Sequence, residues 1–181
     1  SWGAGYNGYD SYAQDVDEFM WDNPSFLIVF AAGNDGPSEH TVGTPATAKD
    51  LVSVGASQNV YTGQDPENVA SFSSNGPTED GRAKPTVCAP GNSVRSASDD
   101  YNVYTYNCGL RYSSGTSMAC PTTAGLAALV RQYYTDGYYP SGAANAADAF
   151  VPSAALLKAT LVNSARIMTG NYTDGPIPST G

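Results

Sequence analysis

A single serine stands at the predicted start of a long apolar helix. Residues 115–121 have the sequence Gly-Thr-Ser-Met-Ala-Cys-Pro, and apolar residues at helical spacing follow from Ala124 to Tyr134. The free N–H groups at a helix N-terminus stabilise an anion that forms beside Ser117 Oγ, and we expect Pro121 in the first turn, where no N–H is needed. Serine also caps helices, so this segment alone fits a cap as well as a nucleophile.

A buried strand is predicted immediately before a polar turn. Residues 26–32 are continuously apolar, and Gly-Asn-Asp-Gly-Pro follows at residues 33–37. Asn34 is therefore expected at the C-terminal end of a strand, which is the edge where sites assemble in parallel α/β sheets. Its side-chain amide is a neutral donor suited to a developing oxyanion, although asparagine in such a string is also a common turn residue.

Helices and buried strands alternate along the chain, and this alternation predicts the α/β class with a parallel sheet. Residues 58–114 are rich in turn residues, and residues 137–148 are expected to form a loop. The predicted helices span residues 11–21, after a cap at Asp10 or Ser11, 122–134 and 153–165, and the predicted strands span residues 26–32 and 51–57, with extended segments near 70–73 and 86–89.

Two segments resemble the oxyanion and nucleophile motifs of the subtilases, the subtilisin-like serine endopeptidases. They are Phe-Ala-Ala-Gly-Asn-Asp-Gly at residues 30–36 and Gly-Thr-Ser-Met-Ala at residues 115–119. The resemblance covers nearly the whole chain and is closest to the bacterial-type alkaline branch. It implies a three-layer, parallel-sheet subtilisin-like fold. Supporting motifs follow in family order at residues 41–45, 52–56, 72–77 and 84–91.

The partners of a catalytic serine are missing from their expected places. Activation of a hydroxyl needs an adjacent base and an orienting carboxylate, and the one histidine, His40, lies in a polar turn where the family has a variable loop. An α/β-hydrolase would need a histidine after Ser117 and glycine where Ala119 stands. Subtilases place Asp and His before the serine, so we expect residues 1–181 to be the C-terminal portion of a catalytic domain. That fold would be incomplete, because the N-terminal part with the catalytic Asp and His is missing.

The resemblance also implies roles for individual residues. Ser117 would be the nucleophile, Asn34 and the Ser117 N–H the oxyanion donors, and Thr116 a secondary support for the oxyanion site. Small residues around the pocket predict a preference for bulky apolar side chains before the cleaved bond. The substrate-binding residues would be Ser1, Trp2 and Gly3 on one wall, Ala31, Ala32 and Gly33 on the other, and Gly43 near the floor.

The composition excludes some partners. Seventeen acidic and eight basic residues give a net charge of −9, which argues against nucleic acids and anionic membranes as partners. No membrane span or signal peptide is visible in the sequence. The expected partners are a protein or peptide substrate, and either an N-terminal segment of the same precursor or further copies in a homo-oligomer. An extracellular or secretory location is expected, and residues 169–181 are expected to be an extended or disordered tail.

The expected chemistry requires no cofactor, and the sequence contains no zinc-binding pattern. Two groups of acidic residues could bind structural calcium or, alternatively, form a solvated surface. Cys88 and Cys120 are expected to be buried as small hydrophobic residues or, alternatively, to be bridged, whereas Cys108 is expected to be exposed. The two acidic groups are Asp15, Asp17 and Glu18 in the first helix, and Asp99 and Asp100 in the turn-rich segment.

Two functional classes fit these observations. The chain is part of a serine endopeptidase whose Asp and His lie on another segment, in which case it is inactive alone because it lacks them. Alternatively, it is a catalytically silent subtilase fragment that acts as a self-associating or structural protein.

Overall fold

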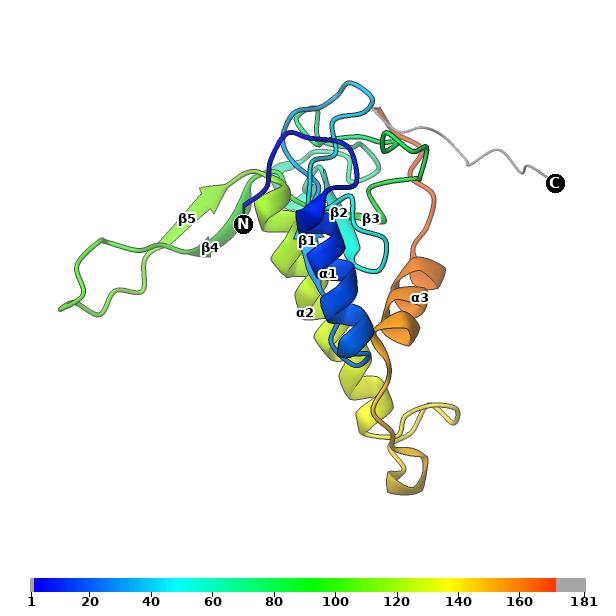
Figure 1. Ribbon diagram of the computed structural model, residues 1–181. Coiled ribbons are helices and arrows are strands. Elements are labelled where there is room, and N and C mark those ends of the chain that lie inside the picture. Colours follow the sequence, from blue (N-terminus) through cyan, green and yellow to red (C-terminus); the bar gives the residue numbers. More distant parts are fainter. Residues whose placement is uncertain (1, 172–181) are drawn as a thin grey trace.

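The computed structural model describes residues 2–171, which fold around a three-stranded parallel sheet (Figure 1). The strands β1 (Val29–Ala31), β2 (Val52–Ser57) and β3 (Val87–Pro90) lie in the order β1-β2-β3. Val29 pairs with Val52, and Val54 pairs with Val87. Every residue of the central strand β2 is buried. The predicted α/β class with a parallel sheet is thus confirmed.

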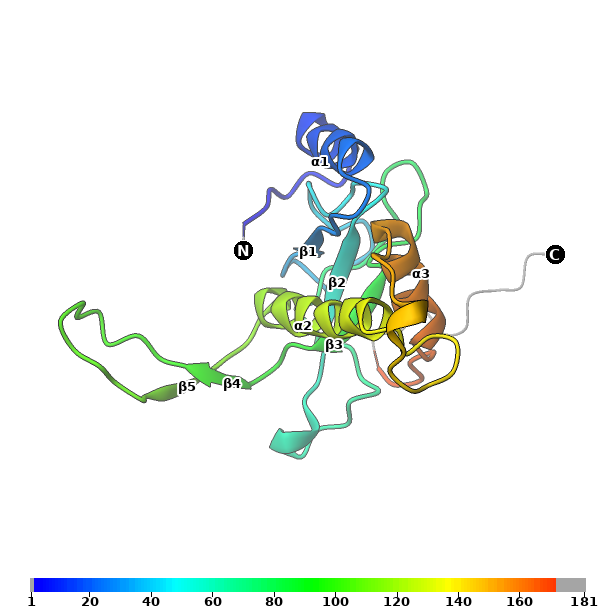
Figure 2. The ribbon, with the colours of Figure 1, turned by 90° about the horizontal axis from the view of Figure 1, so that it is seen from below.

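Helices cover both faces of this sheet. The longest, α2 (Thr116–Thr135), crosses one face and contacts all three strands, whereas α1 (Ser11–Asp22) lies on the opposite side (Figure 2). Neighbouring residues of β1 face opposite sides of the sheet. Val29 packs against the core cluster that contains Ala119 and Ala127 of α2, and Phe30 packs against the cluster that contains Ala13 and Met20 of α1. The third helix, α3 (Ala154–Ser164), packs against α2. None of the helices within residues 2–171 is long and apolar enough to cross a membrane.

The helices begin in two different ways. The Asp10 side chain accepts a hydrogen bond from Ala13 N across 3.1 Å at the start of α1, and Ser153 caps α3 in the same manner. The cap of α2 is Gly115, which has no side chain, and the helix starts at Thr116, well before the predicted residue 122. The prediction of Pro121 in the first turn was therefore wrong, since Pro121 lies inside the helix.

Two strands were not predicted from the sequence. β4 (Val94–Ala97) and β5 (Leu110–Ser113) form an antiparallel hairpin, joined by residues 98–109, that projects from the body (Figures 1 and 2). Neither strand has a buried residue, and only the four residues of β5, Leu-Arg-Tyr-Ser, alternate between apolar and polar. The turn-rich interpretation of residues 58–114 holds for the rest of this segment apart from β3 and a short 3-10 helix, η1 (Val60–Thr62).

Other predicted boundaries differ more modestly. Residues 70–73, predicted as extended, form a turn in which Ser73 N–H donates to Ala70 O. The loop at residues 137–148 contains one 3-10 helix, η2 (Ala146–Asp148). Of the predicted tail at residues 169–181, residues 172–181 lie outside the described part of the chain. At its beginning, Asn171 N donates to Asn68 Oδ1 across 2.6 Å.

Three basic side chains hold the turn that precedes β2. Arg82, Lys84 and Lys158 donate to consecutive carbonyl oxygens of residues 47–49, in that order, across 2.5, 2.6 and 2.7 Å. Asp17 accepts hydrogen bonds from the backbone of the same turn. Lys84 is 8% exposed, and burial lowers its pKa to about 7. This turn connects β2 to residues 43–44, which border the candidate site.

Candidate functional site

Asn34 and the start of α2 meet at one edge of the sheet. Asn34 follows β1, and its Oδ1 accepts hydrogen bonds from Thr116 N across 2.9 Å and from Thr116 Oγ1 across 3.0 Å. The fully buried Thr116 hydroxyl also accepts from Gly33 N across 3.3 Å. These contacts arise because the C-terminal ends of parallel strands and the N-termini of the crossover helices lie at the same edge. The structure therefore brings Asn34 and Thr116 together.

The contact with Thr116 leaves the amino group of Asn34 as the available part of its side chain. A methyl carbon placed on Gly115 would lie 3.6 Å from Ser117 N and 3.7 Å from both Nδ2 and Oδ1 of Asn34, of which Oδ1 is already engaged by Thr116. Both N–H donors thus border the same small space, and neither donates a hydrogen bond within residues 2–171. Two fixed donors that face one point can stabilise an oxygen that gains negative charge.

Sequence reasoning missed the part that Gly115 plays in this arrangement. Its φ is +150°, a conformation that L side chains rarely adopt, and the absence of a side chain keeps the space between the two donors open. The position of the glycine, immediately before Thr116 and Ser117, was the available signal.

Ser117 is the second residue of α2 and is half-buried. No hydrogen bond joins its hydroxyl to another group within the described residues. His40 is exposed in a turn, with a φ of +59°, and its backbone N–H donates to Gly76 O. No hydrogen bond connects His40 with Ser117 among residues 2–171.

The predicted substrate-binding segments lie beside one another. Gly43 N–H donates to Ala32 O across 3.1 Å, and Ala4 N–H donates to Thr44 O across 2.9 Å. Gly43 is therefore held between the segment after β1 and the segment at residues 2–4. A methyl carbon on Gly43 would lie 2.1 Å from Ala4 O, so only glycine fits there. Trp2, which is 63% exposed, packs edge-on against Phe30, with 5.6 Å between ring centroids. Ser1 lies outside the described residues.

The cysteines differ in environment. Cys108 is exposed, as predicted, whereas Cys88 and Cys120 are only partly buried. Cys120 Sγ donates to Val29 O across 3.4 Å and so connects the first turns of α2 to β1. Burial raises the pKa of the Cys120 thiol, which keeps it protonated.

The acidic residues considered for calcium mostly accept hydrogen bonds from the backbone. Asp17 accepts from Lys49 N and Asp50 N, and Asp99 and Asp100 accept from N–H groups that follow them. Within residues 2–171, no group of three or more His, Cys, Asp or Glu side chains is arranged to hold a metal ion.

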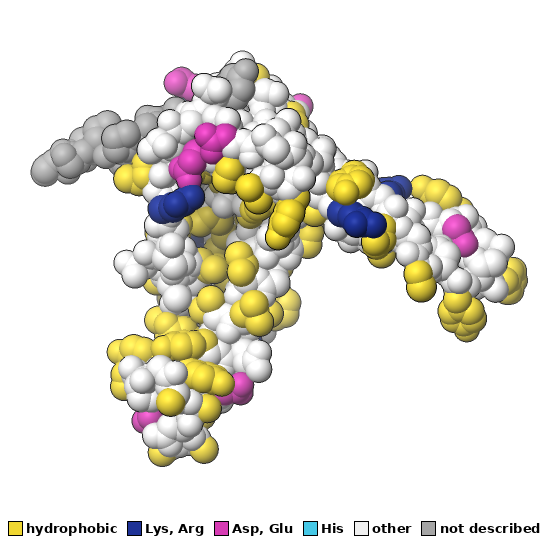
Figure 3. Space-filling view, turned by 180° about the vertical axis from the view of Figure 1, so that it is seen from behind, with side chains coloured by type: hydrophobic (Ala, Val, Ile, Leu, Met, Phe, Trp, Pro, Cys, Tyr) yellow, Lys and Arg dark blue, Asp and Glu magenta, His cyan; other side chains and the backbone are white. Residues whose placement is uncertain are grey.

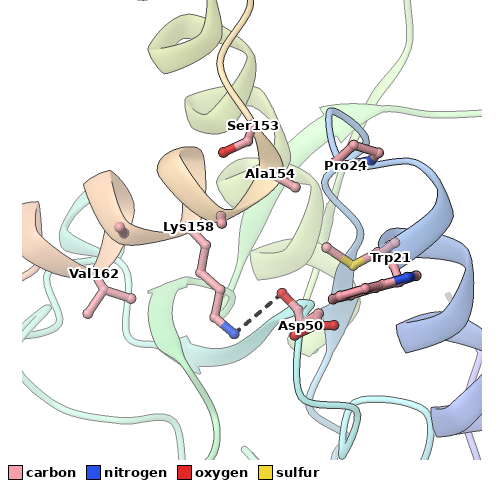
Figure 4. Close-up of a pocket in the computed structure, with 10 residues that line it drawn as sticks. Trp21, Pro24, Asp50, Ser153, Ala154, Lys158 and Val162 are labelled. Atoms are coloured by element: carbon pink, nitrogen blue, oxygen red, sulfur yellow. Dashed lines mark hydrogen bonds between the residues drawn. The ribbon is translucent and has the colours of Figure 1, made fainter.

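A pocket of about 710 Å³ lies away from Asn34 and Ser117, between α1 and α3 (Figure 4). Its wall is mainly apolar and includes Trp21, and Lys158 crosses it to donate to Asp50 O across 3.3 Å. Because these contacts hold the turn before β2, the pocket is part of the scaffold and not of the candidate site.

Comparison with known proteins identifies the relatives of the chain. The model of the subtilase family matches residues 1–178. The chain is 30% identical, over 99% of its length, to the serine protease/ABC transporter B family protein tagD of Dictyostelium discoideum, and 40% identical, over 66% of its length, to the serine protease AprX of Bacillus subtilis (strain 168).

Solved structures show the same similarity. Sphericase superposes with a TM-score of 0.64 over 91% of the chain, and the S41 psychrophilic protease with a TM-score of 0.61 over 90%, each at 30% identity. The chain spans only 14% of tagD and 28% of AprX, and 47% and 46% of the two solved chains.

Proposed function

The chain belongs to the subtilase family, and on this premise we propose that it supplies the nucleophile and the oxyanion donors of a serine endopeptidase. Ser117 Oγ attacks the carbonyl carbon of the substrate peptide bond. The oxygen of that carbonyl gains negative charge in the space bordered by Ser117 N and Asn34 Nδ2. The single observation that carries this proposal is the convergence of these two unpaired donors beside Gly115.

Each neighbouring residue has a defined task in this mechanism. Thr116 holds the Asn34 carbonyl through two hydrogen bonds, so that the amide N–H groups point at the reacting oxygen. Ser1, Trp2 and Gly3, together with Ala31–Gly33 and Gly43, form the pocket for the substrate side chain before the cleaved bond. The small residues of this pocket favour a bulky apolar side chain there.

The base that activates Ser117 comes from a polypeptide segment outside the 181 residues, together with the carboxylate that orients it. The position of His40, which is exposed and has no hydrogen bond to Ser117 among the described residues, supports this proposal. Loss of the base removes most of the acceleration by a catalytic triad, a result established for subtilisin itself. We therefore expect these residues alone to be inactive as a peptidase.

An exposed apolar stripe on α2 supports the need for a further segment. Leu126, Leu129 and Tyr133 lie on one face of the helix and are 50%, 63% and 40% exposed. Hydrophobic side chains are visible along this part of the molecule from behind (Figure 3). Such a stripe is normally covered. We infer that the segment with the Asp and His, or a second copy of the chain, packs there.

The same stripe also favours the second candidate function, that of a silent fragment which associates with itself. Sedimentation of the 181-residue chain separates the two cases. A monomer that becomes larger only when the preceding precursor segment is added supports the peptidase, whereas a stable homo-oligomer without that segment supports the silent fragment.

The central test is covalent labelling. The protein isolated from its source is treated with a fluorophosphonate probe, and labelled residues are identified by mass spectrometry. Labelling at Ser117, absent in Ser117→Ala and unchanged in His40→Gln, is the expected result. Loss of labelling in His40→Gln would make His40 the base. No labelling at Ser117 would contradict a peptidase function.

A further inference from the structure

The hairpin of β4 and β5 forms an arm, defined here as residues 94–113, that extends from the body of the molecule (Figures 1 and 2). Its large apolar side chains are exposed and gather along its length (Figure 3). Soluble proteins rarely expose so many such side chains together unless they bind something. They are Tyr101, Val103, Tyr104 and Tyr106, which are 83% or more exposed, with Leu110 and Tyr112 nearer the base.

The segments that flank the two strands of the arm are bonded to each other immediately before α2, the helix that carries Ser117. Gly115 N–H donates to Gly91 O across 2.8 Å, just before β4 begins. Ser93 N–H donates to Ser114 Oγ across 2.9 Å, and that hydroxyl donates to Asn92 Oδ1 across 2.8 Å. β5 ends at Ser113, and α2 begins at Thr116. The arm is therefore continuous with the rim of the candidate site.

The tip of the arm is ordered by its polar side chains. Asp99 accepts a hydrogen bond from Tyr101 N, Asp100 accepts from Thr105 Oγ1 across 2.5 Å, and Asn102 accepts from Tyr104 N. The polar groups thus satisfy the backbone, and the tyrosine rings remain outside these contacts. Tyrosine has few rotatable bonds, so rings on an ordered loop provide contact area at little cost in conformational entropy.

The charge of the arm restricts the chemistry of its partner. Two arginines, Arg95 and Arg111, balance two aspartates, Asp99 and Asp100, so the net charge of residues 94–113 is 2 − 2 = 0 in a chain of −9. A neutral surface lacks the cation excess that nucleic acids and anionic membranes require. Exposed tyrosines between polar groups are instead typical of surfaces that bind proteins.

The two strands also offer backbone groups to a polypeptide. Within the described residues, β4 and β5 form a sheet of only two strands, so each keeps one edge without a ladder partner. An extended polypeptide can add to such an edge through main-chain hydrogen bonds while its side chains contact the rings. Because the base of the arm is continuous with the rim of the candidate site, a polypeptide held in the site can extend onto the arm.

We propose that the arm binds the polypeptide substrate beyond the residues held in the candidate site, and that its tyrosines select long, unfolded chains over short peptides. This inference rests on the proposed endopeptidase function, because it takes the substrate of that site as the occupant of the arm.

The test compares two ligands of different length. The complete protein carries Ser117→Ala to prevent cleavage, and fluorescence anisotropy measures its affinity for a labelled, reduced and carboxymethylated α-lactalbumin and for a labelled tetrapeptide. The arm variant combines Tyr101→Ser, Tyr104→Ser and Tyr106→Ser. Tyr61→Ser is the matched control, because Tyr61 is 94% exposed but lies on η1, outside the arm.

We expect the arm variant to bind the unfolded polypeptide about tenfold more weakly or worse, with unchanged affinity for the tetrapeptide and an unchanged melting temperature. Tyr61→Ser should leave both affinities as they are. Unchanged polypeptide affinity in the arm variant, an equal loss for both ligands, or no polypeptide binding by the parent protein would overturn the proposal.

Two further measurements separate the alternatives. A dimer that the arm substitutions convert to a monomer, with polypeptide affinity unchanged, would identify a second copy as the occupant and overturn the proposal. Fluorophosphonate labelling of Ser117 does not involve the arm, so a failure of the proposed function shows in that assay while the anisotropy result stands by itself.

Discussion

Asn34 Oδ1 accepts a hydrogen bond from Thr116 N across 2.9 Å, although the two residues are 82 positions apart in the sequence. The bond joins the end of β1 to the first residue of α2. It also fixes which end of the Asn34 amide is available, because the carbonyl is engaged and the amino group is not. The orientation of this one side chain therefore follows from how a strand and a helix meet.

Asn34→Asp tests the amino group separately from the carbonyl. Aspartate keeps an oxygen that can accept from Thr116 N but replaces the donor with a second acceptor, so kcat of the complete enzyme should fall by about 10²- to 10³-fold, a magnitude carried over from subtilisin. Steady-state kinetics on a peptide substrate and thermal unfolding check this. An unchanged kcat would remove Asn34 from the proposed chemistry.

Gly115→Ala should impair the same site by a different route. The added methyl would stand 3.6 Å from Ser117 N and 3.7 Å from Asn34 Nδ2 and would require a φ of +150°. We expect a loss of about 1–3 kcal/mol in unfolding free energy from backbone strain, and weaker binding of a peptide boronate at Ser117. Urea unfolding and inhibition constants measure the two effects.

Gly125→Ala is the matched control for this substitution. Gly125 lies in the interior of α2, where a methyl group would meet nothing within 4 Å. Alanine is the better helix former there by about 1 kcal/mol, so this variant should be more stable and equally active. Equal behaviour of the two alanine variants would contradict the importance assigned to Gly115.

The sequence was sufficient for the parts of the site that depend on contiguous motifs. The positions of Asn34 after a strand and Ser117 at a helix start were predicted from the apolar segments that adjoin them in the sequence. The start of α2 was not, because the N–H of its first residue, Thr116, is bonded to Asn34, a distant partner that local propensity does not include. A Pro121 inside the helix is tolerated for the same reason of tertiary context.

The arm shows the opposite limit of sequence reasoning. Neither β4 nor β5 has a buried residue, and the residues of β4, Val-Arg-Ser-Ala, do not alternate between apolar and polar. The four residues of β5, Leu-Arg-Tyr-Ser, do alternate, but this run is short and leads directly into the motif before α2. Their pairing instead depends on the two ends of the hairpin being held together at Gly91 and Gly115, which are distant from the tip. Nothing in the composition of residues 98–109 distinguishes this arm from an ordinary surface loop.

Asp10 should contribute more to stability than an ordinary helix cap. It accepts hydrogen bonds from Ala13 N and, across 2.5 Å, from the hydroxyl of the buried Thr44. Asp10→Ala removes the cap, worth about 0.5–2 kcal/mol, and leaves the Thr44 hydroxyl without its acceptor, at a further cost of about 1–3 kcal/mol. Ser153→Ala, which removes only the cap of α3, is the control, and urea unfolding of both variants should show the larger loss for Asp10→Ala. Equal losses would contradict the link to Thr44.

The stability of the protein should depend on pH through the buried Lys84. Its side chain donates to Ala48 O, but burial, with a smaller contribution from the nearby cations Lys158 and Arg82, lowers its pKa from 10.5 to about 7. Asp17 and Asp50 oppose this shift without cancelling it. Folding therefore favours the neutral amine, and the unfolded chain binds more protons than the folded chain between these two pKa values.

The sign of the effect follows from this difference in bound protons. The contribution of Lys84 to the free energy of unfolding should be lowest below pH 7. It should rise between about pH 7 and 10.5, by at most about 1.4 kcal/mol per pH unit. Lys84→Met removes this dependence, because methionine fills a similar volume and does not titrate. Urea unfolding of the parent protein and Lys84→Met at a series of pH values separates the effect of Lys84 from that of the other titrating groups, which both proteins share. A stability difference between them that stays constant from pH 7 to 10 would show that Lys84 remains charged in the fold.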